Sequence, residues 1–247
     1  MVKSKKIIIT GSSRGIGLEL VKYFSSKGCE VVANSRNIVE LKNSIKGLDN
    51  IIPIEADLSS ASQAKNFIED SFKKLGGLDL LICNAGGGKS VEPGQEDLME
   101  WKRVFELNLW PTTNAVEFSV PYLENSGGSI ICISSICGIQ VVNGAPVTYS
   151  SAKAALNAFV KGISRPLGAK GVRINAVAPG NIIFEGSSWE GKISQDPDKV
   201  ESLLNNEVTL KRFGTPKEVA DLINFISSSE ASFITGSIYT LDGGQVR

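Results

Sequence analysis

Residues 5–17 read Lys-Lys-Ile-Ile-Ile-Thr-Gly-Ser-Ser-Arg-Gly-Ile-Gly, an apolar run that leads into a glycine-rich turn. The next residues place Leu20, Val21 and Phe24 at the spacing of one helix face. A strand, a glycine turn and a helix in this order can hold a pyrophosphate on backbone N–H groups. We therefore predict a cofactor-binding turn made of Gly11, Ser13, Arg14, Gly15, Ile16 and Gly17. An ordinary strand-to-helix turn is the alternative, because the spacing is G-x-x-x-G-x-G.

Apolar runs and amphipathic stretches alternate along the rest of the chain. Seven runs rich in Ile, Val and Leu are typical of strands buried on both faces, over residues 6–10, 30–34, 51–55, 78–83, 129–134, 173–178 and 237–241. Helical periodicity covers residues 16–26, 60–74, 99–123, 149–168 and 217–227. This order predicts an α/β fold with a doubly wound parallel sheet of seven strands and helices on both faces. We expect one domain over residues 1–247, with 181–212 as a substrate lid.

Composition excludes several kinds of chemistry. The chain has 247 residues, with 26 basic and 26 acidic side chains, so its zero net charge does not favour nucleic-acid binding. It has no histidine, which excludes Ser-His-Asp and Cys-His mechanisms and histidine-ligated metals. The four cysteines form no C-x-x-C pair, and no metal site is expected. Without a membrane-length apolar run or a signal-peptide pattern, we expect a cytoplasmic protein.

The end of the second predicted strand bears on the choice of cofactor. An acidic residue about 20 residues after the glycine turn binds the ribose in NAD-binding domains. Ser35 and Arg36 stand there instead. A 2′-phosphate favours a guanidinium group, and Arg14 is a second candidate for that contact. We therefore predict NADP(H) over NAD(H); the alternative is that Arg36 is a solvated loop charge.

Two further strand ends fit an adenosine site. Asp57 and Leu58 follow the third predicted strand, where Asp57 can accept a hydrogen bond from the adenine amino group or, alternatively, cap a helix. Asn84, Ala85 and Gly86 follow the fourth. The small residues there allow close approach to a ribose, although a plain flexible turn has the same composition.

Tyr149 and Lys153 are candidates for proton transfer. They are four residues apart, so their side chains lie on one edge of the predicted helix. An unperturbed phenol, with a pKa near ~10, is a poor acid–base catalyst at neutral pH. A nearby ammonium group stabilises the phenolate, so we expect Lys153 to lower the pKa of Tyr149. Such a pair is common on helices, and taken alone it indicates little.

Together these motifs resemble those of the short-chain dehydrogenase/reductase family, and the resemblance extends over nearly the whole chain. Five motifs occur in the family's order: Thr10–Gly17, Asn84–Gly86, Tyr149–Lys153, Pro179-Gly180 and Asp242–Gly244. The resemblance implies a single-domain Rossmann fold. It also implies an enzyme that interconverts a ketone and a secondary alcohol by hydride transfer with a nicotinamide cofactor, and it implies a homodimer or homotetramer.

The resemblance also implies roles for individual residues. Tyr149 is then the acid or base, and Lys153 holds the cofactor ribose. Ser135 hydrogen-bonds the substrate oxygen. Asn108 holds a water that connects the lysine to solvent. Ile182 meets the nicotinamide carboxamide through its backbone, beside the cofactor-binding Pro179 and Gly180.

Three positions add detail to this resemblance. Ser134 is an alternative to Ser135, although the S-x-x-G pattern favours Ser135. Phe184 stands where the family often has threonine, so a hydroxyl contact to the cofactor is missing and lid closure is affected. Pro166 is expected to kink or end the helix that begins at Tyr149.

The substrate is expected to contact residues 90–96, 136–148 and 184–212. The family's frequent substrate, a 3-oxoacyl thioester, is the first hypothesis. An acidic acyl carrier protein needs basic residues near the site, and Lys170 and Arg173 are the candidates. A sugar, polyol or small cyclic ketone is the alternative substrate. A non-catalytic NADP(H)-binding sensor or scaffold is the alternative of another class.

Overall fold

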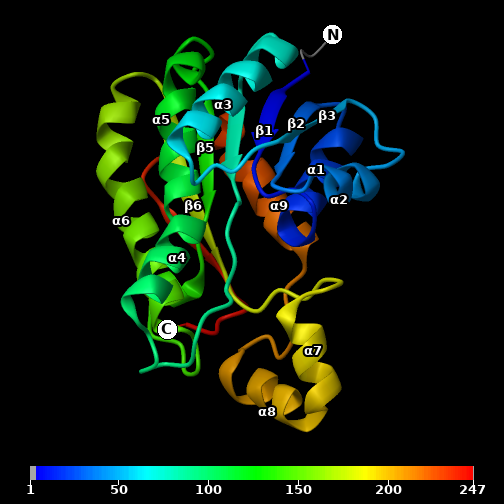
Figure 1. Ribbon diagram of the computed structural model, residues 1–247, viewed down its shortest axis with the longest axis vertical. Coiled ribbons are helices and arrows are strands. Elements are labelled where there is room, and N and C mark those ends of the chain that lie inside the picture. The colour runs from blue at the N-terminus through cyan, green and yellow to red at the C-terminus, as the bar shows by residue number, and fades with distance from the viewer. Residues whose placement is uncertain (1–3, 247) are drawn as a thin grey trace.

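The sheet and its strand order place the functional residues. The structure is a computed structural model that describes residues 4–246 (Figure 1). Its sheet has the order β3-β2-β1-β4-β5-β6-β7, with every neighbouring pair parallel. The strands are β1 (Lys6–Ile9), β2 (Glu30–Ser35), β3 (Ile51–Glu55), β4 (Leu80–Cys83), β5 (Ser129–Ile133), β6 (Arg173–Pro179) and β7 (Ile238–Leu241). The strand order reverses between β1 and β4, which places a ligand crevice at their carboxyl ends.

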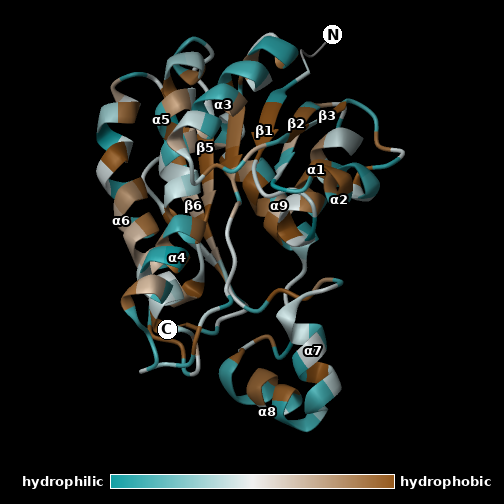
Figure 2. Cartoon of the chain, in the orientation of Figure 1, coloured by the Kyte–Doolittle hydropathy of each residue, from teal (hydrophilic) through white to brown (hydrophobic). Residues whose placement is uncertain are grey.

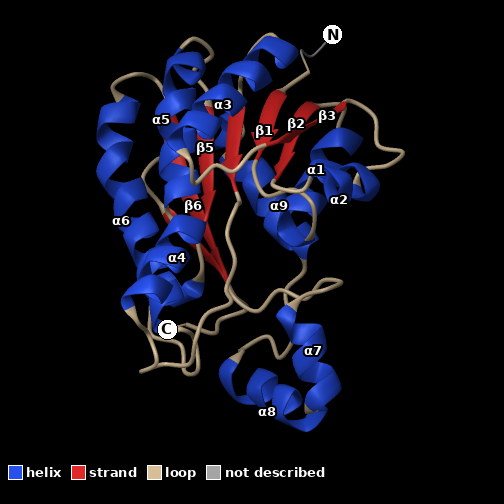
Figure 3. Ribbon diagram, in the orientation of Figure 1, coloured by secondary structure: helices blue, strands red, loops and turns tan. Residues whose placement is uncertain are grey.

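Helices cover both faces of this sheet (Figure 3). One face carries α1 (Gly15–Ser26), α2 (Ile38–Ser44) and α9 (Pro216–Ile226). The other carries α3 (Ala61–Leu75), α4 (Leu98–Asn108), α5 (Trp110–Glu124) and α6 (Val147–Gly168). Two short helices, α7 (Ser188–Gln195) and α8 (Pro197–Glu207), extend away from the sheet in Figure 1. Single 3-10 turns are η1 (Ile136–Gly138) and η2 (Ser229–Ala231). The predicted doubly wound α/β fold is confirmed.

The strands bury side chains on both faces, which explains their lack of polar alternation. Ile8 and Leu81 pack in the layer under α3, α5 and α6, whereas Ile7, Ile9 and Leu80 pack in the layer under α1 and α9. All five are essentially inaccessible to solvent. Burial of apolar surface stabilises a fold by about 25 cal/mol per Å². Figure 2 shows the hydrophobic colour concentrated on the sheet between the two helical layers.

The structure corrects the predicted helix over residues 99–123. Two helices, α4 and α5, replace it and meet at Leu109. Pro111 lies in the first turn of α5 and has no N–H to continue the hydrogen bonding of α4, so the break is local in origin. By contrast, α6 continues two residues past Pro166, within the last helical turn, where one missing hydrogen bond costs little.

The predicted lid, 181–212, contains helices that sequence periodicity did not reveal. No residue of α7 is buried, and α8 buries only Val200. An apolar stripe is the signal that marks a helix in sequence, and these two helices have almost none. Within residues 4–246, none of the helices has the length and apolar character to cross a membrane.

Candidate active site

The glycine turn between β1 and α1 is packed tightly against the start of the β4–α4 loop. Gly11 and Gly15 have φ angles of +65° and +58°, which glycine adopts without strain. A Cβ on Gly11 would lie 2.7 Å from the Cα of Ala85, and one on Gly17 would collide with the carbonyl oxygen of Gly11. These three positions therefore require glycine.

The amino end of α1 leaves its N–H groups available. Arg14 occupies the N-cap position without a side-chain capping bond, and the first turn contains no acidic residue. The first N–H groups of a helix have no intrahelical partner, and they attract an anion. Ser13 and Ile16, two of the residues predicted to form the glycine turn, are both partly exposed. The residues present fit the pyrophosphate of a dinucleotide.

Asn84 holds this turn in place. Its backbone N–H donates to Thr10 Oγ1 at 2.9 Å, and its Nδ2 donates to the carbonyl oxygen of Gly11 at 2.7 Å. The N–H of Ala85 also donates to Thr10 Oγ1, at 3.0 Å. The predicted Asn84-Ala85-Gly86 motif thus connects the carboxyl ends of β1 and β4. Its first residue is structural in this arrangement, and Gly86 lies deeper, toward Lys153.

The end of β2 carries free positive charge. Arg36 and Arg14 are exposed, and neither guanidinium takes part in an ion pair within residues 4–246. The Ser35 hydroxyl accepts a hydrogen bond from the N–H of Asn37 at 3.1 Å, which shapes the turn after the strand. Two uncommitted guanidinium groups at this end of the cleft fit a terminal phosphate.

Asp57 lies at the end of β3 and does not cap α3. Its Oδ1 accepts from the N–H of Ser59 at 3.0 Å and from the Ser59 hydroxyl at 2.8 Å. The N-cap of α3 is Ser60. The predicted partner Leu58 is buried. The helix-capping alternative for Asp57 is therefore wrong, and its contact to an adenine ring stays a prediction.

The proton-transfer residues come together at the carboxyl end of β5. Tyr149 and Lys153 lie on successive turns at the start of α6, and Ser135 follows β5 as the N-cap of η1. Lys153 is buried; its Nζ donates to the carbonyl oxygen of Ile133 at 2.8 Å and lies 5.8 Å from the centre of the Tyr149 ring. The Ser135 side chain is close enough to the phenol to influence its pKa. The structure thus brings the three predicted side chains together.

The protonation of these groups differs from the sequence expectation. Burial raises the pKa of Tyr149 to about 12, with the Ser135 side chain opposing the shift and Cys137 adding to it. Burial also lowers the pKa of Lys153 to about 8. The expected fall in the pKa of Tyr149 is wrong for this structure, because burial is the largest influence on it. At neutral pH the phenol therefore carries its proton and can donate it.

Asn108 ends α4 and fixes the loop above Lys153. Its Oδ1 accepts from the N–H of Gly87 at 3.0 Å, and its Nδ2 donates to the Gly87 carbonyl at 3.1 Å. A Cβ on Gly86 would lie 2.8 Å from Asn108 Oδ1 and 3.5 Å from Lys153 Nζ. Asn108 and Lys153 thus both lie close to Gly86, and the water between asparagine and lysine stays a prediction.

Ser134 is excluded as the substitute for Ser135. Its hydroxyl donates to Asn157 Oδ1 at 2.6 Å, and Asn157 Nδ2 donates to the carbonyl oxygen of Gly138 at 3.0 Å. These bonds fasten η1 to α6. Ser134 is therefore used for structure, and Ser135 is the hydroxyl beside Tyr149.

The segment after β6 contains Ile182, whose backbone is predicted to meet a carboxamide. Gly180, which follows Pro179 at the end of β6, packs against Asp242, so the two glycine motifs meet. Ile182 pairs with Gly214 as a parallel bridge, through the Asn181 carbonyl and the Ile183 N–H. Because ladder bonds alternate in direction, the N–H and C=O of Ile182 itself point to the other side.

Phe184 makes a contact that the sequence did not predict. A Cβ on Gly15 would lie 2.8 Å from the Phe184 ring, so the ring packs directly against the glycine turn. Its backbone carbonyl accepts from the N–H of Ser187, the N-cap of α7, at 2.9 Å. The sequence predicted the loss of a hydroxyl contact at this position. In the structure, the Phe184 ring instead makes an apolar contact with the glycine turn.

The predicted carrier-protein residues are not at the site. Lys170 pairs with Glu124 at 2.6 Å, and the Arg173 guanidinium donates to the carbonyl oxygens of Ile226 and Ser228. Arg173 is the first residue of β6, so both lie at the amino edge of the sheet, opposite Tyr149. Their assignment to a docking surface at the site mouth is wrong.

Acidic side chains outnumber basic ones in two segments that border or include residues expected to contact the substrate. Residues 88–97 carry one basic and three acidic side chains, and residues 184–212 carry four basic and six acidic ones. Residues 136–148 carry no charge.

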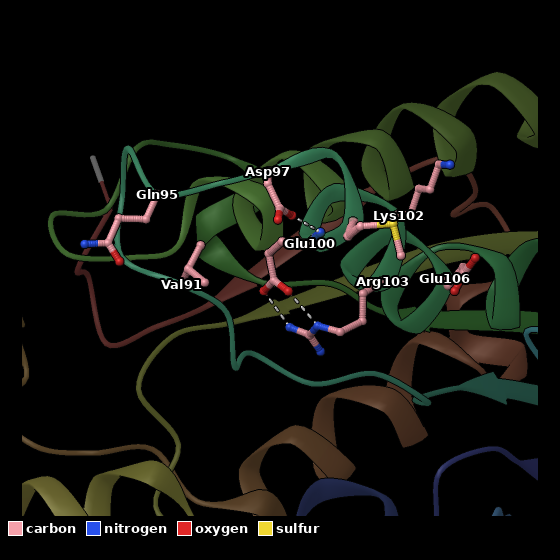
Figure 4. Close-up of a pocket in the computed structure, with 8 residues that line it drawn as sticks. Val91, Gln95, Asp97, Glu100, Lys102, Arg103 and Glu106 are labelled. Atoms are coloured by element: carbon pink, nitrogen blue, oxygen red, sulfur yellow. Dashed lines mark hydrogen bonds and ion pairs between the residues drawn. The ribbon is translucent and has the colours of Figure 1, made fainter.

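A cavity of about 500 Å³ lies beside α4 (Figure 4). Glu100 and Arg103 are among the residues that line it, and Tyr149 is not.

Comparisons with known proteins agree with this geometry. A family model described as enoyl-(acyl carrier protein) reductase matches residues 11–245. The 3-oxoacyl-[acyl-carrier-protein] reductase of Thermotoga maritima is 31% identical, over 99% of both chains. The 7alpha-hydroxysteroid dehydrogenase of Escherichia coli is 28% identical, over 98% of this chain and 94% of that protein. The structure of L-sorbose reductase from Gluconobacter frateurii complexed with NADPH and L-sorbose superimposes with a TM-score of 0.91 at 27% identity, covering 99% of this chain and 97% of that one.

Proposed function

Because this chain belongs to the short-chain dehydrogenase/reductase family, we propose that it is an NADP(H)-dependent reductase that converts a ketone to a secondary alcohol, with Tyr149 as the proton donor. Members of the family are oxidoreductases that act on CH–OH or carbonyl groups with a nicotinamide cofactor, and this chain is one of them. The convergence of Tyr149, Lys153 and Ser135 beside the glycine turn is the observation that carries the proposal.

The cofactor site is assigned to the carboxyl ends of β1, β4 and β6. The uncapped end of α1 binds the pyrophosphate, and the backbone of Ile182 binds the carboxamide. Asp57 and the Asn84–Gly86 segment border the adenosine half. When bound, the nicotinamide supplies or accepts the hydride.

The preference for NADP(H) rests on charge. Arg36 and Arg14 are exposed and free of ion pairs in the described chain, and β2 ends without an acidic residue. A guanidinium binds a 2′-phosphate with two hydrogen bonds, whereas the missing carboxylate removes the usual partner of a ribose hydroxyl. The NADPH bound to the sorbose reductase supports the same choice.

The protonated phenol favours reduction at neutral pH. Tyr149 donates its proton to the substrate carbonyl oxygen as negative charge develops there. The Ser135 hydroxyl donates a hydrogen bond to the same oxygen. Lys153, in its charged form, stabilises the phenolate that remains and holds the cofactor ribose. Asn108 fixes the backbone beside Lys153 and carries the water through which the proton is replaced.

The site rim favours a small uncharged ketone, such as a sugar, polyol or cyclic ketone. The acidic excess in 88–97 and 184–212 repels an acidic carrier protein, and the uncharged 136–148 segment suits a neutral substrate. Reduction of a 3-oxoacyl thioester is the second candidate, because the chain is 31% identical to a 3-oxoacyl-[acyl-carrier-protein] reductase. The proposed protein is cytoplasmic and assembles as a homodimer or homotetramer. Residues 1–247 form one domain, in which 181–212 is the substrate lid.

A carbonyl panel with purified protein tests the function. Loss of NADPH absorbance is followed with small ketones and sugars, with a 3-oxoacyl-CoA, and with a 3-oxoacyl carrier protein. Tyr149→Phe is expected to lower kcat by roughly 100-fold or more while the Kd for NADPH stays within twofold. Tyr122→Phe, on α5 against Phe72, is the matched control and keeps wild-type activity. NADPH binding without turnover of any carbonyl would instead identify a sensor or scaffold.

A further inference from the structure

A chain of hydrogen-bonded side chains ends next to Tyr149. Ser90 Oγ donates to Glu100 Oε1 at 2.6 Å and lies 2.6 Å from Thr148 Oγ1. Arg103 binds Glu100 through two parallel bonds, from Nε at 2.7 Å and from Nη2 at 2.6 Å (Figure 4). Three separate segments, the β4–α4 loop, α4 and the first turn of α6, are joined by these four side chains.

The direction of each hydrogen bond between these side chains is determined. A serine hydroxyl has one proton, and Ser90 gives it to Glu100, which as a carboxylate only accepts. The bond between Ser90 and Thr148 is therefore donated by Thr148. Hydrogen bonds from Arg103 and Ser90 lower the pKa of Glu100 to about 2, so this order holds throughout the neutral range.

These hydrogen-bonded side chains fasten a helix end that lacks a side-chain cap. Pro146 is the N-cap of α6 and provides no capping bond. Thr148, fully buried, is the second residue of the helix and directly precedes Tyr149. Its hydroxyl bond to Ser90 therefore fixes the first turn of α6 against the neighbouring loop.

The same loop passes the catalytic ring. A Cβ on Gly88 would lie 3.9 Å from Tyr149 Cζ, two residues before Ser90. Arg103 Nη2 also donates to the carbonyl oxygen of Lys89 at 2.9 Å, so the guanidinium holds the loop and the carboxylate together. The Glu100 side chain is 14% exposed and the Arg103 side chain 50%, so the carboxylate is the more enclosed partner of the ion pair. Loop, α4 and Tyr149 thus form one braced unit.

We propose that Thr148, Ser90, Glu100 and Arg103 position Tyr149 for proton transfer by bracing the first turn of α6 against residues 88–91. The four residues act through Tyr149 and are positioning residues. This inference rests on the proposed function, because it assigns the brace to the proton donor of that reaction. A shift of about 1 Å in a reacting group can lower the rate by up to roughly 100-fold.

Two substitutions at Thr148 form the central test. Thr148→Val removes the hydroxyl and keeps the shape, whereas Thr148→Ser keeps the hydroxyl and serves as the matched control. We expect Thr148→Val to lower kcat about tenfold, with the KM for ketone and the Kd for NADPH within twofold of wild type. Thr148→Ser should retain kcat within twofold. Ser90→Ala should reproduce the loss, and the double variant Ser90→Ala/Thr148→Val should lose no more than either single variant.

A spectroscopic measurement gives a readout independent of turnover. In protein labelled at the ζ carbon of its four tyrosines, the Tyr149 resonance is assigned from Tyr149→Phe. It should move in Thr148→Val and in the loop variant Ser90→Ala, and it should stay in place in Thr148→Ser, with the other three resonances unchanged.

The outcomes separate this inference from the proposed function. Wild-type kcat and an unmoved Tyr149 resonance in Thr148→Val and Ser90→Ala would overturn the brace and leave the function standing. Equal losses in Thr148→Ser and Thr148→Val would also overturn it, since the hydroxyl would then not matter. A wild-type protein that turns over no carbonyl would overturn the function, and with it the role of the brace in proton transfer.

Discussion

Helices α1 and α9 lie on the same face of the sheet and share one apolar core, yet their amino ends are built in opposite ways. At α9, Thr215 Oγ1 accepts from the N–H of Glu218, and Glu218 Oε2 accepts from the N–H of Thr215 at 2.8 Å. Arg212 adds an ion pair to Glu218 at 2.7 Å. At α1, Arg14 provides no side-chain cap and the first turn contains no acidic residue.

The contrast indicates that the amino end of α9 contributes to stability and that the amino end of α1 is available for binding. A capping box satisfies two N–H groups of a helix end and places a carboxylate there, which disfavours a bound anion. An uncapped end forgoes that stabilisation and keeps N–H groups and positive potential for an anion. Substitutions at α1 should therefore alter cofactor affinity, and substitutions at α9 should alter stability.

The largest effect is expected from Gly17→Ala at the α1 end. The added methyl group would collide with the Gly11 carbonyl oxygen and stand 2.5 Å from Asn84 Nδ2, so the turn must move. We expect the Kd for NADPH, measured by calorimetry, to rise at least about 100-fold, since every pyrophosphate contact shifts. Gly162→Ala on α6, where a Cβ meets nothing within 4 Å, is the control and keeps the wild-type Kd. Equal affinities in both variants would contradict the assigned turn.

Arg36→Ala should have the next largest effect. Hydrogen bonds to a charged group contribute about 1.5–3 kcal/mol, so NADPH should bind about 10- to 100-fold more weakly. The affinity for NADH should be unchanged, because that cofactor has no 2′-phosphate. Lys42→Ala, an exposed charge on the nearby α2, provides the comparison for a general loss of positive charge. An equal loss of affinity for NADPH and NADH would show that Arg36 does not bind the 2′-phosphate.

Thr215→Ala should affect stability and spare binding. Removal of a threonine N-cap costs about 1 kcal/mol of unfolding free energy. Urea unfolding measures that loss, and the Kd for NADPH should remain within twofold of wild type. A variant that keeps full stability and loses NADPH would reverse the contrast between the two helix ends.

The smallest expected effect is a pH dependence of the unfolding free energy that arises from Glu218 at the amino end of α9. Arg212 and the N–H of Thr215 hold the pKa of Glu218 down to about 2, below its ordinary value of 4.5. A lowered folded-state pKa stabilises the fold above the unfolded-state pKa, and the stabilisation is lost as pH falls from 4.5 toward 2. The stability advantage of wild type over Glu218→Gln should shrink across that window. Solvent screening keeps the difference small, and a constant advantage down to pH 2 would contradict the capping role.

Local sequence patterns determined much of this molecule. Every predicted strand lies within two residues of the observed strand, because a buried parallel strand has an apolar run that is recognisable without its neighbours. The parallel, doubly wound sheet followed from the alternation of strands and helices, and the order of the motifs identified Gly11, Tyr149 and Ser135 as candidates. Local chemistry also fixed the helix break at Leu109, because Pro111 cannot continue the hydrogen bonding of α4.

Contacts between distant segments decided the rest. Desolvation by surrounding elements, which no spacing encodes, raised the pKa of Tyr149 against the expected attraction of Lys153. Arg173 turned out to bind carbonyl oxygens of chain segments more than 50 positions away, and Phe184 turned out to cover Gly15. A residue's type and spacing specify which face of an element it occupies. Its solvent exposure, its partners and its protonation depend on which other elements the fold packs against that face.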